Sequence, residues 1–100
     1  MEVKIEKNEN ITTVKFKGRL DTPASQEVAA TLLPIQENAS GTIILDCEEL
    51  EYISSSGLRI FLSLRKAAAT KGGKVIVKSI NASIRNVFMM TGFLNLFEIA

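Results

Sequence analysis

The sequence predicts an α/β fold built on a mixed, mostly parallel β-sheet. Segments with the apolar period of strands and segments with the period of helices follow each other in the order ββαβαβαβ. Strands that alternate with helices become parallel neighbours joined by right-handed crossovers. One hundred residues suffice for one hydrophobic core, so residues 1–100 are predicted to form a single domain.

The first two strands are predicted over Val3–Lys7 and Ile11–Lys17. Both segments alternate apolar side chains with polar or charged ones, which is the pattern of a half-buried strand. The residues between them, Asn8–Asn10, are typical of a turn, so the two segments should pair as an antiparallel hairpin. Gly18 is expected to end the second strand.

A helix should begin after this hairpin, with Thr22 as its N-cap and Pro23 at the first helical position. Pro34 lacks the N–H group that a continuing helix needs, and it is therefore expected to break or kink the helix. The following segment, Asn38–Gly41, is predicted to be a loop. The apolar face of the helix comprises Val28, Leu32 and Leu33.

The third strand is predicted over Thr42–Asp46, and its unbroken apolar run indicates a central position in the sheet. The next helix should extend from about Ser56 to Thr70, because Gly72 and Gly73 provide a C-terminal stop. One face of this helix is predicted to carry Leu58, Phe61, Leu62, Arg65 and Ala69, with Leu64 and Ala68 flanking it.

The remaining elements are a strand, a helix and a short edge strand. The fourth strand is predicted over Lys74–Lys78. Asn81 can cap a third helix that runs through Met90, and Gly92 is placed to end it. The segment Leu94–Ile99 is expected to form the last strand.

Composition excludes several classes of function. The 12 basic and 11 acidic residues give a net charge of +1, so nothing favours a nucleic-acid partner. The chain has one cysteine, Cys47, and no histidine, which excludes an internal disulfide, a Cys–His nucleophile and a histidine metal site. No apolar run approaches the length of a membrane span, so membrane insertion is not expected.

The most informative stretch is Tyr52–Arg59, in which three serines and Gly57 precede a helix. One serine is explained as an N-cap, which is worth about 1 kcal/mol over alanine. Three consecutive hydroxyls exceed that need. Because a helix N-terminus favours negative charge, a second hypothesis is a serine that carries a phosphate. Gly57 is unfavourable within a helix and indicates a tight turn or a close approach to the backbone.

The segment around these serines, Asp46–Leu58, resembles the signature of the STAS domain, which is found in bacterial anti-sigma factor antagonists and in sulphate transporters. Two further segments match the family in the same order. Gly18–Asp21 resembles its Gly-x-Leu-Asp turn, and Met90–Phe93 resembles its Met-Ser-Gly-Leu helix end. The resemblance implies a single-layer sheet in the order 1-2-3-4-5, with the helices packed on one side.

The resemblance also implies a function, that of a cytoplasmic anti-sigma factor antagonist without enzymatic activity. The unmodified form would bind an anti-sigma factor with serine kinase activity and thereby release a sigma factor. Phosphorylation by that kinase would abolish binding, and a serine phosphatase of the metal-dependent type would restore it. No cofactor is implied, because ATP and Mg²⁺ belong to the kinase.

Two alternatives stay open on the sequence. One is a non-switching scaffold or an accessory subunit of a stress-signalling or lipid-transport complex, as other STAS domains are. The other is a nucleotide- or anion-binding module that uses the same helix N-terminus, although the chain lacks a glycine-rich fingerprint.

Three predicted loops should meet at the carboxyl ends of the strands: 18–22, 48–57 and 79–83. In the family the modified serine lies two residues before the glycine, which is Ser55 here, with Ser54 and Ser56 as less favoured acceptors. Asp21 is expected to contribute to partner contact rather than to folding, and an acid–base pair with Asp46 is not indicated. The predicted partner-binding residues are Asp21, Thr22, Ser54, Ser56, Gly57, Ser79 and Asn81.

Overall fold

The computed structural model describes residues 1–100. Its elements in chain order are β1 (Glu2–Asn8), β2 (Ile11–Leu20), α1 (Thr22–Glu37), β3 (Thr42–Ile53), α2 (Ser55–Lys71), β4 (Lys74–Lys78), α3 (Ala82–Thr91), the 3₁₀ turn η1 (Phe93–Asn95) and β5 (Glu98–Ile99). The predicted element order is therefore confirmed.

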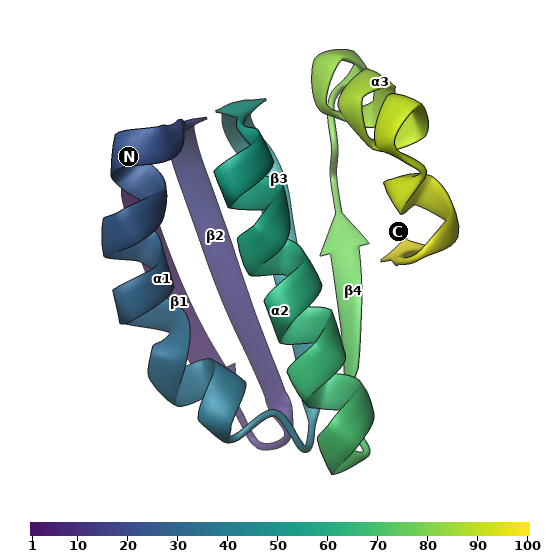
Figure 1. Ribbon diagram of the computed structural model, residues 1–100. Coiled ribbons are helices and arrows are strands. Elements are labelled where there is room, and N and C mark those ends of the chain that lie inside the picture. The colour runs from purple at the N-terminus through teal and green to yellow at the C-terminus, as the bar shows by residue number, and fades with distance from the viewer.

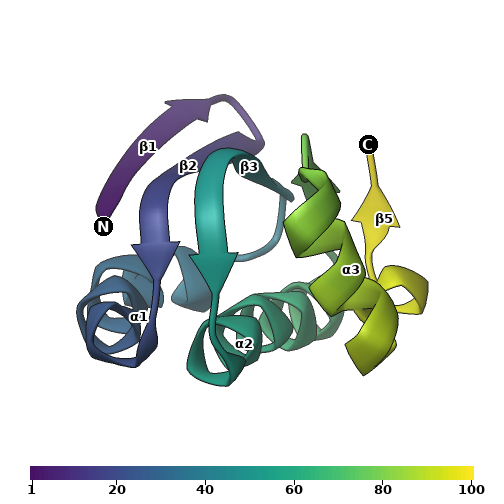
Figure 2. The same ribbon diagram turned by 90° about the horizontal axis from the view of Figure 1, so that it is seen from above.

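The five strands form one sheet in the order β1-β2-β3-β4-β5. β1 and β2 pair as the predicted antiparallel hairpin, and every later pair is parallel. The helices cover one face of this sheet (Figures 1 and 2). This is the single-layer arrangement that the resemblance implies.

The core lies between the sheet and the helices and is organised around Phe61 of α2. The ring of Phe61 lies 5.4 Å from that of Phe16 on β2, and 6.1 Å and 6.5 Å from those of Phe88 and Phe97. Edge-on and tilted aromatic pairs at these distances add to the stabilisation from burial alone. One helical side chain therefore ties the centre of the sheet to the C-terminal elements.

Two strands are longer than predicted. β2 continues past Lys17 to Leu20, and Gly18 lies inside it with a φ of +103° instead of ending it. β3 continues past Asp46 to Ile53, so most of the loop predicted over 48–57 is strand. Register shifts between Lys15 and Lys17 and between Gly18 and Arg19 let the two strands stay paired. Each shift adds one residue to β3, so the pairing continues beyond the apolar run on which the prediction of β3 relied.

Of the break or kink predicted at Pro34, the break is wrong, because α1 continues through this residue to Glu37. Ile35 keeps the last turn packed on the core, and the side-chain amide of Asn38 donates a hydrogen bond of 2.8 Å to the Pro34 carbonyl. These contacts offset the backbone hydrogen bond that proline removes.

The buried face of α2 differs from the predicted one. Phe61, Leu64 and Ala68 lie at its centre, whereas Arg65 and Ala69 are exposed and Leu62 is only half-buried. The face is rotated because α2 packs against α1 as well as against the sheet.

β4 spans the predicted residues, and α3 has the predicted Asn81 and Gly92 caps. The last strand is much shorter than the predicted segment 94–99, since η1 occupies its first residues. None of the helices combines the length and the apolar character needed to cross a membrane.

Candidate functional site

The ends of β2 and β3 place the first turns of α1 and α2 next to each other. Leu20 and Ile53 are register partners in the last pair of these two parallel strands. The N–H of Ser54 donates a hydrogen bond of 2.9 Å to the Leu20 carbonyl, which extends the pairing by one residue. Both helices therefore start at the same end of the sheet (Figure 1). We call this end the serine edge.

Asp21 caps α1 at the serine edge. Its Oδ1 accepts a hydrogen bond of 3.0 Å from the N–H of Ala24, and its carbonyl accepts one of 2.7 Å from Ser25 Oγ. The predicted N-cap, Thr22, is instead the exposed first residue of the helix. The aspartate takes the cap because its backbone is still extended and its carboxylate reaches the N–H of the third helical residue, Ala24. Asp21 therefore contributes to folding, whereas the sequence analysis predicted a contribution to partner contact only.

Ser54 caps α2 in the same way. Its Oγ accepts a hydrogen bond of 3.1 Å from the N–H of Gly57, and the residue is only 7% exposed. Ser55 is the first helical residue and is exposed, whereas Ser56 is half-buried. The three serines therefore differ in accessibility, and only Ser55 combines a free hydroxyl with a fully open position.

Gly57 is a packing requirement of the serine edge. A Cβ atom at this position would lie 2.8 Å from Leu20 Cγ and 2.9 Å from Ile53 Cγ1. The first turn of α2 therefore rests directly on the ends of β2 and β3, which is the close approach that the sequence indicated. Gly57 is buried, as is Ser54, so both residues support the helix start from within.

A shallow groove of about 220 Å³ separates the first turns of the two helices. Thr22 and Gln26 of α1 and Ser56 and Arg59 of α2 line it, together with Ser25, Ala29 and Ile60. The structure therefore brings two of the predicted partner-binding residues, Thr22 and Ser56, to the walls of one groove.

Hydrogen bonds to other parts of the domain fix the loop that was predicted over 79–83. Asn81 caps α3, since its Oδ1 accepts a hydrogen bond of 2.9 Å from the N–H of Ile84, and its Nδ2 donates one of 2.9 Å to the Leu50 carbonyl on β3. Ser79 has a φ of +61°, and its N–H donates to the Ala100 carbonyl at 3.2 Å. Asn81 is thus tied to β3, whereas Ser79 is tied to the end of the chain beyond β5.

Two features of this region escaped the sequence analysis. Arg59 lies one helical turn after Ser55 and is exposed, a relation that the four-residue spacing could have revealed. The guanidinium of Arg19 lies 4.4 Å from the centre of the Tyr52 ring, a cation–π contact that depends on the shifted register of β2 and β3.

Asp46 does not belong to the serine edge. Asp46 is 7% exposed, accepts a hydrogen bond of 3.1 Å from the N–H of Glu48, and lies in register with Lys15 and Lys78 inside the sheet. It is therefore remote from the serine edge at which Asp21 lies. No cluster of three or more acidic or cysteine side chains is arranged to hold a metal ion. The polar groups of the serine edge include the hydroxyls of Thr22, Ser55 and Ser56, the amide of Gln26, the half-buried carboxylate of Asp21 and the guanidinium of Arg59, all of which can form hydrogen bonds with a partner.

A model of the STAS domain family matches residues 2–100 of this chain. The anti-sigma F factor antagonist of Paenibacillus polymyxa is 26% identical over 100 residues, which cover 99% of this chain and 86% of that protein. The anti-sigma-B factor antagonist of Bacillus subtilis is 24% identical over 98 residues, which cover 98% of this chain and 89% of that protein.

The fold is also similar to that of SpoIIAA, an anti-sigma factor antagonist whose structure is known in two forms. The unphosphorylated form matches with a TM-score of 0.78 and 20% identity, over 99% of this chain and 87% of SpoIIAA. The phosphorylated form of the Bacillus protein matches with a TM-score of 0.77 and 22% identity, over 99% of this chain and 91% of that structure.

Proposed function

The chain belongs to the STAS domain family, and from that premise we propose that it is an anti-sigma factor antagonist that phosphorylation of Ser55 switches off. The unmodified domain binds an anti-sigma factor that is also a serine kinase, and a sigma factor is released. The domain catalyses no reaction itself, and it acts in the cytoplasm. The names of its relatives as anti-sigma factor antagonists support this assignment.

The observation that carries the proposal is the difference between the three serines. Ser54 Oγ is engaged with the N–H of Gly57 in a buried cap, and Ser56 is half-buried, whereas Ser55 stands exposed at the first helical position. A kinase must align the acceptor oxygen with the γ-phosphate of ATP, so it needs an accessible hydroxyl. Ser55 meets that requirement without any unfolding of α2.

The helix start also suits a phosphate on Ser55. The N–H of Gly57 is taken by Ser54, but helix geometry gives the N–H groups of Ser55 and Ser56 no acceptor within the helix. A phosphate adds about −1.5 to −2 charges at pH 7, and the N-terminal end of the helix dipole favours that charge. Phosphorylation would therefore change the contact surface while the fold is kept.

We assign the predicted partner-binding residues two kinds of role. Thr22 and Ser56 contact the partner at the groove beside Ser55, and the carboxylate of Asp21 contributes while it caps α1. Ser54 and Gly57 act from within by fixing the helix start. Ser79 and Asn81 form the outer rim of the contact on the α3 side.

The test has a chemical step and a binding step. Incubation with the host's anti-sigma factor kinase and ATP should place the phosphate on Ser55, as read by peptide mass spectrometry. Calorimetric titration should then show that Ser55→Asp binds the kinase at least about tenfold more weakly than Ser55→Ala, because the aspartate places a charge in a desolvated contact.

Ser40→Asp is the matched control, because Ser40 is also an exposed serine but lies in the loop between α1 and β3, away from the serine edge. It should bind like the unmodified domain. Equal affinities of Ser55→Asp and Ser55→Ala would contradict the switch and favour a non-switching scaffold. The phosphorylated domain should regain its affinity for the kinase after incubation with a metal-dependent serine phosphatase.

A further inference from the structure

Charge is divided sharply along the chain. Residues 52–97 contain seven cationic side chains and no carboxylate, a net charge of +7: Arg59, Arg65, Lys66, Lys71, Lys74, Lys78 and Arg85. Residues 1–51 contain five cations and ten carboxylates, a net charge of −5. The near-neutral total of +1 therefore conceals a basic half that includes α2 and α3.

Two of these cations lie on the solvent-facing side of α2 in line with Ser55. At about 100° per residue, Ser55, Arg59 and Lys66 fall within roughly 40° of one another on the helix surface. All three are exposed, and they point away from the buried face centred on Leu64 and Ala68. We call Ser55, Arg59 and Lys66 the basic stripe. Along the axis, Arg59 lies about 6 Å and Lys66 about 16 Å from Ser55.

No carboxylate of the domain neutralises this stripe. The three ion pairs of the structure join Lys15 to Glu6, Lys17 to Glu49 and Lys74 to Glu98, and none involves Arg59 or Lys66. The neighbouring helix α1 has the opposite character, with Glu27 and Glu37 and no cation. Because α1 and α2 lie side by side in the helix layer (Figure 1), a basic helix stands beside an acidic one.

We propose that the basic stripe of α2 docks an acidic segment of the anti-sigma partner. This inference rests on the proposed function and adds the chemistry of the partner surface. A patterned protein surface fits better than a polyanion, because the acidic α1 would repel a continuous chain of phosphates. A lipid surface would also require large apolar side chains, and none of those exposed on the domain lies on α2.

A phosphate on Ser55 would weaken the docking of the acidic segment on the basic stripe in two ways. A phosphate four residues before Arg59 on the same helix face can pair with its guanidinium. The same phosphate repels the acidic segment that the stripe would otherwise attract. The switch then acts by replacing an intermolecular partner of Arg59 with an intramolecular one.

The experiment measures association of the domain with the host's anti-sigma factor kinase by stopped-flow fluorescence at low and at physiological salt. Lys66→Glu should slow association about tenfold at low salt and flatten its salt dependence, since charges at a contact act chiefly on the association rate. Arg59→Glu should have a larger effect. The matched control is Lys4→Glu, which makes the same charge change at an exposed position of the edge strand β1 and should alter the rate by less than about twofold.

Each other outcome overturns the inference in a recognisable way. Unchanged association of Lys66→Glu would show that the stripe does not face the partner. An equal effect of Lys4→Glu would attribute the rate to net charge. Binding of the unmodified domain to duplex DNA or to phosphatidylglycerol vesicles that is lost in Lys66→Glu would assign the stripe to a polyanion.

The proposed function and the docking surface are tested by different measurements. If Ser55→Asp and Ser55→Ala bind equally while Lys66→Glu is slow, the docking surface stands without the switch. If Ser55→Asp binds weakly while Lys66→Glu behaves like the unmodified domain, the switch stands and the docking surface falls.

Discussion

The two ends of the sheet are built on different principles. At the serine edge, side chains cap the helices: Asp21 closes the start of α1, Ser54 that of α2 and Asn81 that of α3. At the opposite end, backbone groups bond directly to one another. The N–H of Thr42 donates to the Asn10 carbonyl at 2.8 Å, and that of Lys74 donates to the Gly41 carbonyl at 3.1 Å.

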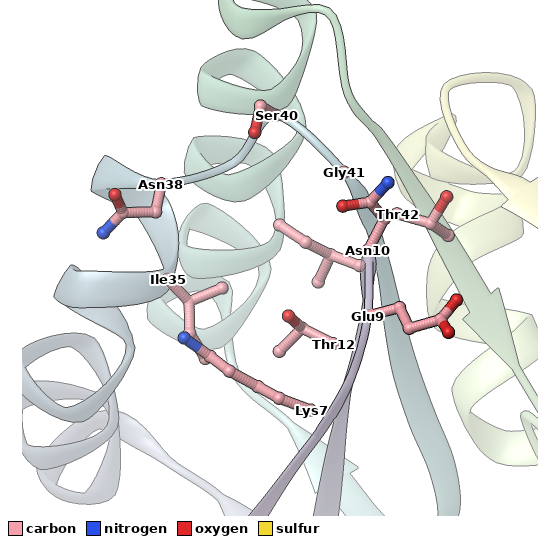
Figure 3. A pocket seen from close by; sticks show the side chains of 10 residues that line it. Lys7, Glu9, Asn10, Thr12, Ile35, Asn38, Ser40, Gly41 and Thr42 are labelled. Carbon is pink, nitrogen blue, oxygen red and sulfur yellow. The ribbon is translucent and has the colours of Figure 1, made fainter.

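The opposite end contains a polar pocket of about 180 Å³ (Figure 3). Lys7 and Asn10 from the hairpin, Asn38 at the end of α1 and Ser40 in the following loop contribute to its lining. A Cβ atom on Gly41 would lie 2.3 Å from the Asn10 carbonyl oxygen, and one on Gly73 would lie 2.3 Å from that of Ala39. The backbones are thus in closest contact where the loops turn.

This comparison separates a structural end from a recognition end. At the opposite end, hydrogen bonds between backbone groups fix the turns beside the pocket. The side-chain caps engage Asp21, Ser54 and Asn81, and they leave the hydroxyl of Ser55 and the side chains of Thr22 and Arg59 exposed. The two ends therefore differ in what fixes their shape: backbone-to-backbone hydrogen bonds at one end and side-chain caps at the other.

The largest expected effect is on the structural end. Gly41→Ala should lower the free energy of unfolding by about 3 kcal/mol, because the new methyl group meets backbone atoms that cannot move aside. Gly57→Ala should cost less, about 1 kcal/mol, since it meets side chains and gains helix propensity. Urea unfolding curves of both variants give the order, with exposed Ser40→Ala as control. A larger loss of stability for Gly57→Ala than for Gly41→Ala would contradict the distinction between the two ends.

The helix caps should give intermediate effects. Ser54→Ala and Asp21→Ala should each lower stability by about 1 kcal/mol, because each leaves a helical N–H without its acceptor. Ser55→Ala and Thr22→Ala, each one residue further along, should change stability by less than about 0.5 kcal/mol. Thermal melts of these four variants locate the true caps. A larger loss for Ser55→Ala than for Ser54→Ala would move the cap to the proposed phosphate acceptor.

The smallest effect concerns the interior between the two ends and emerges only at alkaline pH. Burial, together with the adjacent charge of Asp46, raises the pKa of the Cys47 thiol to about 12 from its ordinary value of 9.0. Between these values the unfolded chain releases a proton that the folded domain keeps, so stability should fall as the pH rises above 9.0.

Comparison with Cys47→Ala isolates this contribution, because all other groups titrate alike in both proteins. The difference in stability between the two proteins should be constant at neutral pH and should change above pH 9.0. Alkylation of Cys47 at neutral pH should proceed only as fast as the domain opens. A thiol that reacts at the rate of a free cysteine would show that the interior is not closed.

The sequence predicted the fold well where the local pattern and the packing agree. Local pattern alone predicted the strand Lys74–Lys78. It also predicted the caps of α3, since Asn81 suits a helix start and Gly92 a helix end. The error at Pro34 arose because the burial of Ile35 outweighs a local preference. β3 was predicted too short because its unbroken apolar run ends at Asp46, whereas the strand continues through the acidic residues that follow by means of register shifts.

The candidate site divides in the same way. Three serines before a helix were enough to indicate a capped helix start and a candidate phosphate acceptor. Which serine caps could not be predicted, since Ser54 and Ser55 offer the same hydroxyl and differ only in how the chain leaves β3. Asp21 was likewise predicted to act only in partner contact. Its role as a helix cap could not be predicted, because it depends on the backbone geometry that brings its carboxylate to the N–H of Ala24.

The order of elements, the hairpin and the serine-rich start of α2 were determined by the sequence itself. Each depends on a local property of the chain: side-chain period, turn formation or helix capping. Helix spacing places Arg59 and Lys66 on one side of α2 with Ser55. The tertiary structure alone decided that this side faces solvent, and that Ser54 is buried while Ser55 is exposed. The physical reason is that exposure depends on which face of a helix the sheet covers, and the packing of Gly57 on Leu20 and Ile53 sets that rotation.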